Sequence, residues 1–268
     1  LSSLGISFVL VAVLVGTFVI GRQALSNGRE RFSQIETSTL VSSGDIIKMA
    51  LSPDGKYVAL IEYKGDLQRL LVKQPNSSNA VELIPPSGDK FIGVAFSPDA
   101  ESIYYSIYPS SEGSNPEGKA GRLYKIPVLG GPQIEIVNDI DSPVAISTDG
   151  KHFAFIRRVP SEETAQLIVL EQNESGIRER ILASRPFTEA FSNDGLSWSP
   201  DGKNLAAVAH NENASMDLVI VETENGEQRK LNQESWEWVG QTAWLQGGES
   251  LLFTAYREGS SNFTDEIW

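Results

Sequence analysis

The stretch Ser52-Pro53-Asp54-Gly55-Lys56 recurs unchanged at Ser199-Pro200-Asp201-Gly202-Lys203. Altered copies are Ser97-Pro98-Asp99-Ala100-Glu101, Ser147-Thr148-Asp149-Gly150-Lys151 and, most degraded, Leu245-Gln246-Gly247-Gly248-Glu249. The copies start at positions 52, 97, 147, 199 and 245, and are therefore 45, 50, 52 and 46 residues apart. Self-similarity at a spacing of this size indicates a repeat architecture.

The repeated stretch is typical of a tight turn between two strands. Proline presets the backbone of a type I turn, aspartate bonds backbone amides beyond itself, and glycine takes positive φ without strain. Apolar runs on either side make each copy a hairpin signal. We therefore assign the recurring residues a structural role in the turns: Asp54, Gly55, Asp99, Asp149, Gly150, Asp201 and Gly202.

Each turn lies in the same frame of four short apolar runs. The first run ends at the turn, as in Val94–Phe96, and the second follows it, as in Ser102–Ile107. A third and a fourth come after polar loops, as in Arg122–Pro127 and Gln133–Val137. Four strands in about 45 residues are typical of one β-propeller blade. The sequence predicts an all-β propeller over residues 44–268. It would contain about five four-stranded antiparallel blades, the last of them truncated.

Composition excludes several classes of function. The net charge of −13 argues against nucleic acid as a partner of this part, because phosphate binding relies on clustered lysine and arginine. There are no cysteines, and the two histidines, His152 and His210, have no partner at ligand spacing. We expect no metal, no cofactor and no catalytic residue in this part of the protein.

The N-terminus carries an uncharged apolar run from Leu4 to Gly21. Eighteen helical residues span about 27 Å, close to the thickness of a bilayer core. The sequence predicts a transmembrane helix within residues 1–21 and a polar juxtamembrane connector over 22–43, with a cleaved signal peptide as the rival interpretation. Ala12 and Gly16 form a small-xxx-small pair, a weak hint of helix pairing and hence of a homodimer.

At this point a family resemblance becomes specific. The turn stretch inside a four-strand repeat resembles the TolB-like (WD-repeat-like) propellers of bacteria. The segments Arg31–Ile61, Arg122–Gly131 and Asp141–Ile156 resemble the C-terminal propeller of membrane-bound bacterial serine/threonine kinases. Similar propellers also follow winged-helix regulators and precede the hydrolase domain of prolyl-oligopeptidase-type peptidases. The kinase motifs, a glycine-rich nucleotide loop, HRD and DFG, do not occur in the sequence, and neither does the G-x-S-x-G of serine hydrolases. We therefore expect neither kinase nor serine-peptidase chemistry in these residues.

The kinase resemblance implies a non-catalytic sensor. The propeller would lie outside a bacterial inner membrane, on a single-pass protein, and bind an unknown protein or small molecule. Alternatives are the accessory propeller of a membrane-anchored serine peptidase and the propeller of a membrane-bound winged-helix regulator.

Ligand-binding residues are harder to identify, because the residues that recur between copies are assigned to the turns. Positions near the start of each first strand would line the central channel, and they differ between copies: Ile47, Ile92, Ser142, Asp194 and Gly240. Trp236, Trp238 and Trp244 cluster around the fifth first strand, where packing between blades and an exposed recognition surface are alternative interpretations.

Overall fold

The computed structural model describes residues 45–110, 120–173, 176–231, 236–257 and 266–267, all within the unit Ser43–Trp268. The predicted transmembrane helix and connector lie outside these residues, as does most of the loop 109–121. No helix in the described ranges is long and apolar enough to cross a membrane. The helical segments among the described elements are two 3-10 turns, η4 (Pro160–Glu162) and η5 (Phe187–Glu189).

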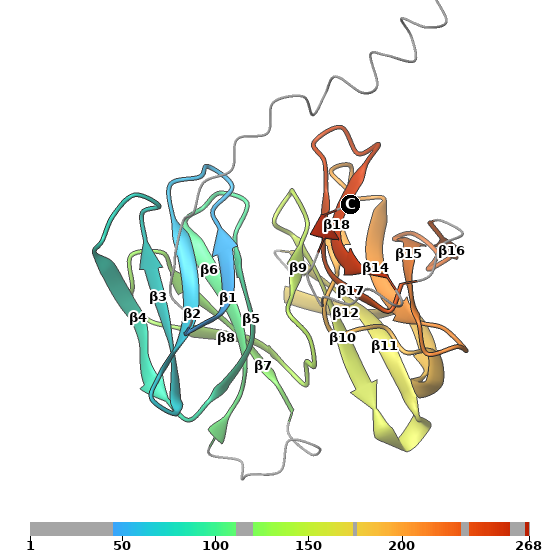
Figure 1. Cartoon of the computed structure of the whole chain (residues 1–268), viewed down its shortest axis with the longest axis horizontal. Helices are drawn as coiled ribbons and strands as arrows, with labels where there is room; N and C mark the ends of the chain where they lie inside the picture. The colour runs from blue at the N-terminus through green and yellow to red at the C-terminus, as the bar shows by residue number, and fades with distance from the viewer. Residues whose placement is uncertain (1–44, 111–119, 174–175, 232–235, 258–265, 268) are drawn as a thin grey trace, which may run out of the picture. The chain divides into compact units, whose positions relative to one another are not determined.

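The described residues form five antiparallel sheets that follow one another along the chain (Figure 1). In every sheet, strands that are consecutive in sequence are neighbours in space. The first sheet contains β1 (Ile46–Leu51), β2 (Val58–Lys64), β3 (Leu67–Lys73) and β4 (Ala80–Ser87), and the second β5 (Lys90–Phe96), β6 (Ser102–Tyr108), β7 (Arg122–Pro127) and β8 (Ile134–Asn138).

The later sheets repeat this plan. The third contains β9 (Ala145–Ile146), β10 (His152–Val159), β11 (Thr164–Asn173) and β12 (Gly176–Pro186), and the fourth β13 (Ser197–Trp198), β14 (Asn204–His210), β15 (Met216–Glu222) and β16 (Gln228–Lys230). The fifth contains β17 (Trp238–Trp244), β18 (Leu251–Tyr256) and β19 (Glu266–Ile267). Four four-stranded sheets and three strands of a fifth confirm the predicted all-β architecture.

The core lies between successive sheets rather than on one side of each. One buried cluster joins the first and second sheets through residues such as Ile61 and Phe96, and a second joins the second and third through Tyr104 and Phe153. Two further clusters join the third sheet to the fourth and the fourth to the fifth. Middle strands are therefore covered on both faces, which explains why they read as continuous apolar runs rather than as an alternation.

Each intact turn is organised by a buried serine. The Oγ of Ser52 donates to Asp54 Oδ1 (2.7 Å) and accepts the Tyr57 N–H (2.9 Å), while Asp54 Oδ1 accepts the Lys56 N–H (3.1 Å). The same three bonds recur around Ser97, Ser147 and Ser199. The four serines are only 2 to 6% exposed, so the hydroxyl and the amide it accepts are satisfied inside the protein.

The fourth residue of each turn takes positive φ, as the turn mechanism predicts. Gly55, Gly150 and Gly202 have φ of 71°, 69° and 72°. Ala100 holds the same position at φ 60°, although its Cβ disfavours that conformation. In the degraded fifth copy, Gly248 has φ 71° and bonds the Leu245 carbonyl (2.8 Å), so the backbone turn survives without serine or aspartate.

The hydrogen bonds also keep the turn aspartates ionised. Bonds from Lys56 and Ser52 lower the pKa of Asp54 to about 2. The Ser199 hydroxyl is the main cause of the lowered pKa of Asp201. Because these carboxylates are committed as acceptors within their own turns, the structure supports the assignment of a structural role.

Replacing Ser199 with alanine should lower the free energy of unfolding by about 1–3 kcal/mol, because the Asn204 N–H loses its buried acceptor. Urea denaturation of the chain measures the change. Ser250 is exposed and occupies the place of Asn204 in the fifth copy, so Ser250→Ala is the matched control and should change stability by less than about 0.5 kcal/mol. An equal loss of unfolding free energy in Ser199→Ala and Ser250→Ala would contradict the role given to the buried serine.

Exchanging the residues at the positive-φ position should have opposite effects in two turns. Ala100→Gly should raise the free energy of unfolding by about 0.5–1 kcal/mol, because glycine removes the backbone strain. Gly202→Ala should lower it by about 1 kcal/mol, and through the backbone alone, since an added Cβ meets nothing within 4 Å. Thermal and urea denaturation of both variants check this, and changes of the same sign would disprove it.

Candidate functional site

All five sheets border one cavity of about 360 Å³, through their first strands or the segments that lead into them. It is lined at the turn-proximal ends of β1 and β5 and by the segments that lead into β9 and β13, together with part of β17. We call it the channel cavity. Its lining consists of Met49, Ala50, Leu51, Val94, Ala95, Phe96, Pro143, Val144, Asn193, Asp194, Gly195, Leu196, Gln241 and Thr242.

A salt bridge joins the first sheet to the fourth at this cavity. Lys48 Nζ lies 3.1 Å from Asp194 Oδ1, although the two residues are 146 apart in sequence. Their side chains are 27% and 42% exposed, so water screens the pair. At the residue after Asp194, Thr242 Oγ1 donates to the Gly195 carbonyl (2.9 Å) and ties the fifth sheet to the fourth.

The cavity lining is amphipathic. Met49 and Leu51 are 42% and 52% exposed and offer apolar surface, while Asn193, Asp194 and Gln241 offer polar groups. Such a surface can hold a ligand with both apolar and hydrogen-bonding parts, as a peptide segment has.

Of the five residues predicted to line the channel, Asp194 is the one that lines this cavity. Ile47 packs partly buried against the core between the first and second sheets, and Ile92 is 8% exposed. Ser142 is fully buried; its Oγ accepts the Ile156 N–H (2.8 Å) and donates to a backbone carbonyl. Gly240 is buried, and an added Cβ would lie 2.3 Å from the Trp238 ring.

A local irregularity explains the different placement of three of these residues. Ile47, Ile92 and Gly240 each fall within a register shift between the first and second strands of their sheet. A bulge adds residues on one strand and changes which face the following side chains point to. In β1 and β5 the lining begins beyond the bulge, at Met49 and Val94, so positions near the strand start miss it. The signal that could have found it is the apolar pair Met49 and Leu51, two residues apart beside a turn.

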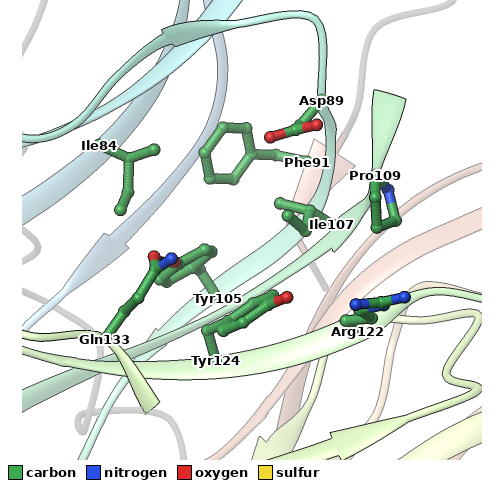
Figure 2. A pocket seen from close by; sticks show the side chains of 9 residues that line it. All are labelled: Ile84, Asp89, Phe91, Tyr105, Ile107, Pro109, Arg122, Tyr124 and Gln133. Carbon is green, nitrogen blue, oxygen red and sulfur yellow. The ribbon is translucent and has the colours of Figure 1, made fainter. Parts of the chain in front are cut away.

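A second cavity, of about 250 Å³, lies between the first and second sheets and is shown in Figure 2. Phe91 and Tyr105 are in tilted contact with ring centroids 5.7 Å apart, and Tyr105 stacks on Tyr124 at 5.5 Å. The Tyr105 hydroxyl donates to Gln133, and burial raises the pKa of Tyr105 above its usual range. Figure 2 places Gln133 and Arg122 at opposite ends of this aromatic wall.

The polar groups around the second cavity already have partners in the protein. Asp89 accepts bonds from the Ser87 hydroxyl (3.0 Å) and from the Ser110 N–H and hydroxyl (2.7 and 2.9 Å). Arg122 lies 3.6 Å from Glu135. The cavity therefore offers aromatic surface more than free charge.

The histidines and tryptophans take separate places. His152 Nδ1 lies 3.3 Å from Asp149 within its turn, and His210 lines a third cavity between the third and fourth sheets. Trp236 is 2% exposed, and Trp244 Nε1 donates to the Ser197 carbonyl (3.2 Å) of the neighbouring sheet. These two tryptophans pack between sheets. Trp238 stacks on a tyrosine of its own sheet.

Comparison with known proteins places this geometry among propellers. No protein-family model matches the chain. The "Uncharacterized peptidase YuxL" of Bacillus subtilis (strain 168) is 33% identical over 120 residues, which cover 42% of this chain and 17% of that protein. TolB from Acinetobacter baumannii matches with a TM-score of 0.65 at 19% identity, over 84% of this chain and 52% of that one. Prolyl oligopeptidase B from Galerina marginata matches with a TM-score of 0.53 at 17% identity, over 83% of this chain and 33% of that one.

The chain has the TolB-like β-propeller fold that the repeats predicted. Solved structures that share this fold include peptidases as well as TolB. The chain spans about half the length of the first TolB structure and about a sixth of the curated peptidase.

The salt bridge at the channel cavity should couple Lys48 and Asp194 energetically. In a double-mutant cycle with Lys48→Met and Asp194→Asn, we expect an interaction free energy of about 0.2–1 kcal/mol, because the pair is partly exposed. Urea denaturation at low and high salt measures it, and salt should reduce the coupling. A coupling of zero at low salt would show that the two side chains do not interact in solution.

Proposed function

We propose that this chain is the propeller part of a longer protein and serves it as a non-catalytic binding module, with a serine peptidase as the accompanying catalytic domain. The observation that carries the proposal is the 33% identity to a protein named as a peptidase. The propeller fold shared with prolyl oligopeptidase B supports it. In this role the channel cavity would receive a peptide segment, with Met49 and Leu51 contacting its apolar side chains and Asn193 and Gln241 its backbone.

A second candidate is the extracytoplasmic sensor of a single-pass receptor kinase. The apolar run Leu4–Gly21 and the resemblance of segments such as Arg31–Ile61 to kinase propellers favour it. The propeller would then bind its ligand outside the inner membrane and signal through the helix, for instance by a change in dimerisation.

A labelling experiment on the full-length gene product separates these candidates. If the peptidase proposal holds, a fluorophosphonate probe should label one serine that lies outside residues 44–268, because this chain has no G-x-S-x-G. Leu51→Asp in the channel cavity should raise KM for peptide substrates several-fold with little change in kcat. Labelling within the propeller would overturn the non-catalytic assignment.

The kinase candidate predicts different results from the same protein. The probe should label nothing, ATP should support autophosphorylation, and external protease should cleave a C-terminal tag in intact spheroplasts. Autophosphorylation without labelling would overturn the peptidase proposal. Protection of the tag until lysis would overturn the sensor candidate.

A further inference from the structure

The third cavity, of about 310 Å³, lies between the third and fourth sheets and differs from the others in its charge. Arg158 and His210 border it from the ends of β10 and β14. Phe187, Phe191, Ser192 and Asn193 border it from the segment that joins the two sheets. Asn193 also lines the channel cavity, so the two cavities adjoin.

The sequence repeat explains why this cavity lacks the carboxylate that Asp89 places at the second cavity. In the third sheet, the Asp141 N–H bonds the Ile156 carbonyl (2.9 Å), and the Asp141 carboxylate accepts the N–H of Arg158, two residues beyond Ile156 (2.8 Å). In the second sheet, Asp89 likewise accepts the Ser110 N–H (2.7 Å). An acidic side chain thus caps the end of the second strand in both sheets.

The fourth sheet has Ser192 where the third sheet has Asp141. The Ser192 N–H bonds the Val208 carbonyl (2.8 Å), as Asp141 bonds Ile156, which makes His210 the counterpart of Arg158. The His210 N–H is accepted by the Ala190 carbonyl (2.9 Å) instead of by a carboxylate. The 3-10 turn η5 ends just before Ala190 and places the Ala190 carbonyl beside the His210 N–H. An acidic side chain is therefore not needed to accept this N–H.

Two guanidinium groups lie over the phenylalanines of this segment. The Arg158 guanidinium lies 5.0 Å from the Phe187 ring centroid, and that of Arg185 lies 5.3 Å from Phe191. Within the described part of the chain, neither forms a salt bridge, although Arg185 bonds Gln228 (2.8 Å) and a backbone carbonyl. Stacking covers a guanidinium face and leaves its N–H edge able to bind an anion.

Nearby carboxylates do not neutralise this cavity completely. Asp141 remains charged, but its two oxygens accept the backbone N–H of Arg158 and the Tyr108 hydroxyl (3.1 Å), and among the described residues it forms no ion pair with the Arg158 guanidinium. Glu189 lies close enough to Arg185 to raise its pKa, although burial lowers that pKa more strongly. Arg158 is therefore the cation best placed to meet a ligand in the cavity, in a chain that is otherwise strongly acidic.

We propose that this cavity binds a carboxylate carried on an apolar body, as in the C-terminal residue of a peptide or a small organic acid. Arg158 pairs with the carboxylate, Ser192 and Asn193 offer further hydrogen bonds, and Phe187 and Phe191 receive the apolar part. A lining with one arginine, with His210 beside it and two phenylalanines among its apolar residues, suits a monoanion better than a phosphate, which favours several arginines and lysines. The proposal holds whichever catalytic domain accompanies the propeller.

Titration calorimetry on the full-length protein tests the site with N-acetyl-phenylalanine and its amide, which lacks the negative charge. We expect the acid to bind and the amide to bind at least about tenfold more weakly, since the charge-assisted bond to Arg158 is lost. A peptide ending in phenylalanine and its C-terminally amidated form make a second pair. Loss of peptide binding on amidation identifies a peptide terminus as the ligand, and binding of the small acid alone identifies an organic acid.

Three variants make the test specific. Arg158→Gln removes the charge, and Ser192→Asp restores the carboxylate found in the other sheets, so each should weaken binding of the acid at least about tenfold. Arg178→Gln, on the exposed part of β12, is the matched control and should bind as the unaltered protein does. Unchanged thermal unfolding shows that each variant folds. No binding of any probe, equal binding of acid and amide, or equal losses in the Arg158 and Arg178 variants would overturn the proposal.

Discussion

The fold depends on a buried serine hydroxyl that joins a turn to the strand after it. In four of the five turns this hydroxyl donates to an aspartate and accepts the N–H of the residue five positions on, as Ser52 does with Asp54 and Tyr57. The bond fixes the hairpin between the first two strands of each sheet, and those strands carry most of the core. The fifth turn keeps only the backbone bonds of Leu245, which shows that the chain tolerates one turn without the network.

Because the repeated residues are committed to the turns, binding properties depend on where the repeats differ. Lys48 and Asp194 have no like-charged counterparts in the other sheets, and they meet at the channel cavity. Ser192 stands where two other sheets use an acid as a cap, and it lines the same cavity as Arg158. A repeat protein can change such positions one at a time, since the core clusters join successive sheets and the turn network maintains the rest.

The candidate site could be predicted only in part. Asp194 was identified from its place in the repeat, but Met49 and Leu51 were not, because bulges at Ile47 and its counterparts change which residues face the channel. A bulge depends on how two strands pair, and the sequence of one strand does not contain that information. The cavity between the third and fourth sheets was missed for a related reason, since no local pattern around Ser192 or His210 predicts that they lie together.

The sequence by itself determined the repeat, the four-strand plan of the first four sheets and the all-β propeller, because the repeat spacing and turn chemistry are local properties that survive in degraded copies. It also identified the residues that hold the turns, such as Asp201 and Gly202. Only the tertiary structure decided which side chains line a cavity and which charges meet. Lys48 and Asp194 are 146 residues apart, and their contact follows from the packing of whole sheets, which no short stretch of sequence encodes.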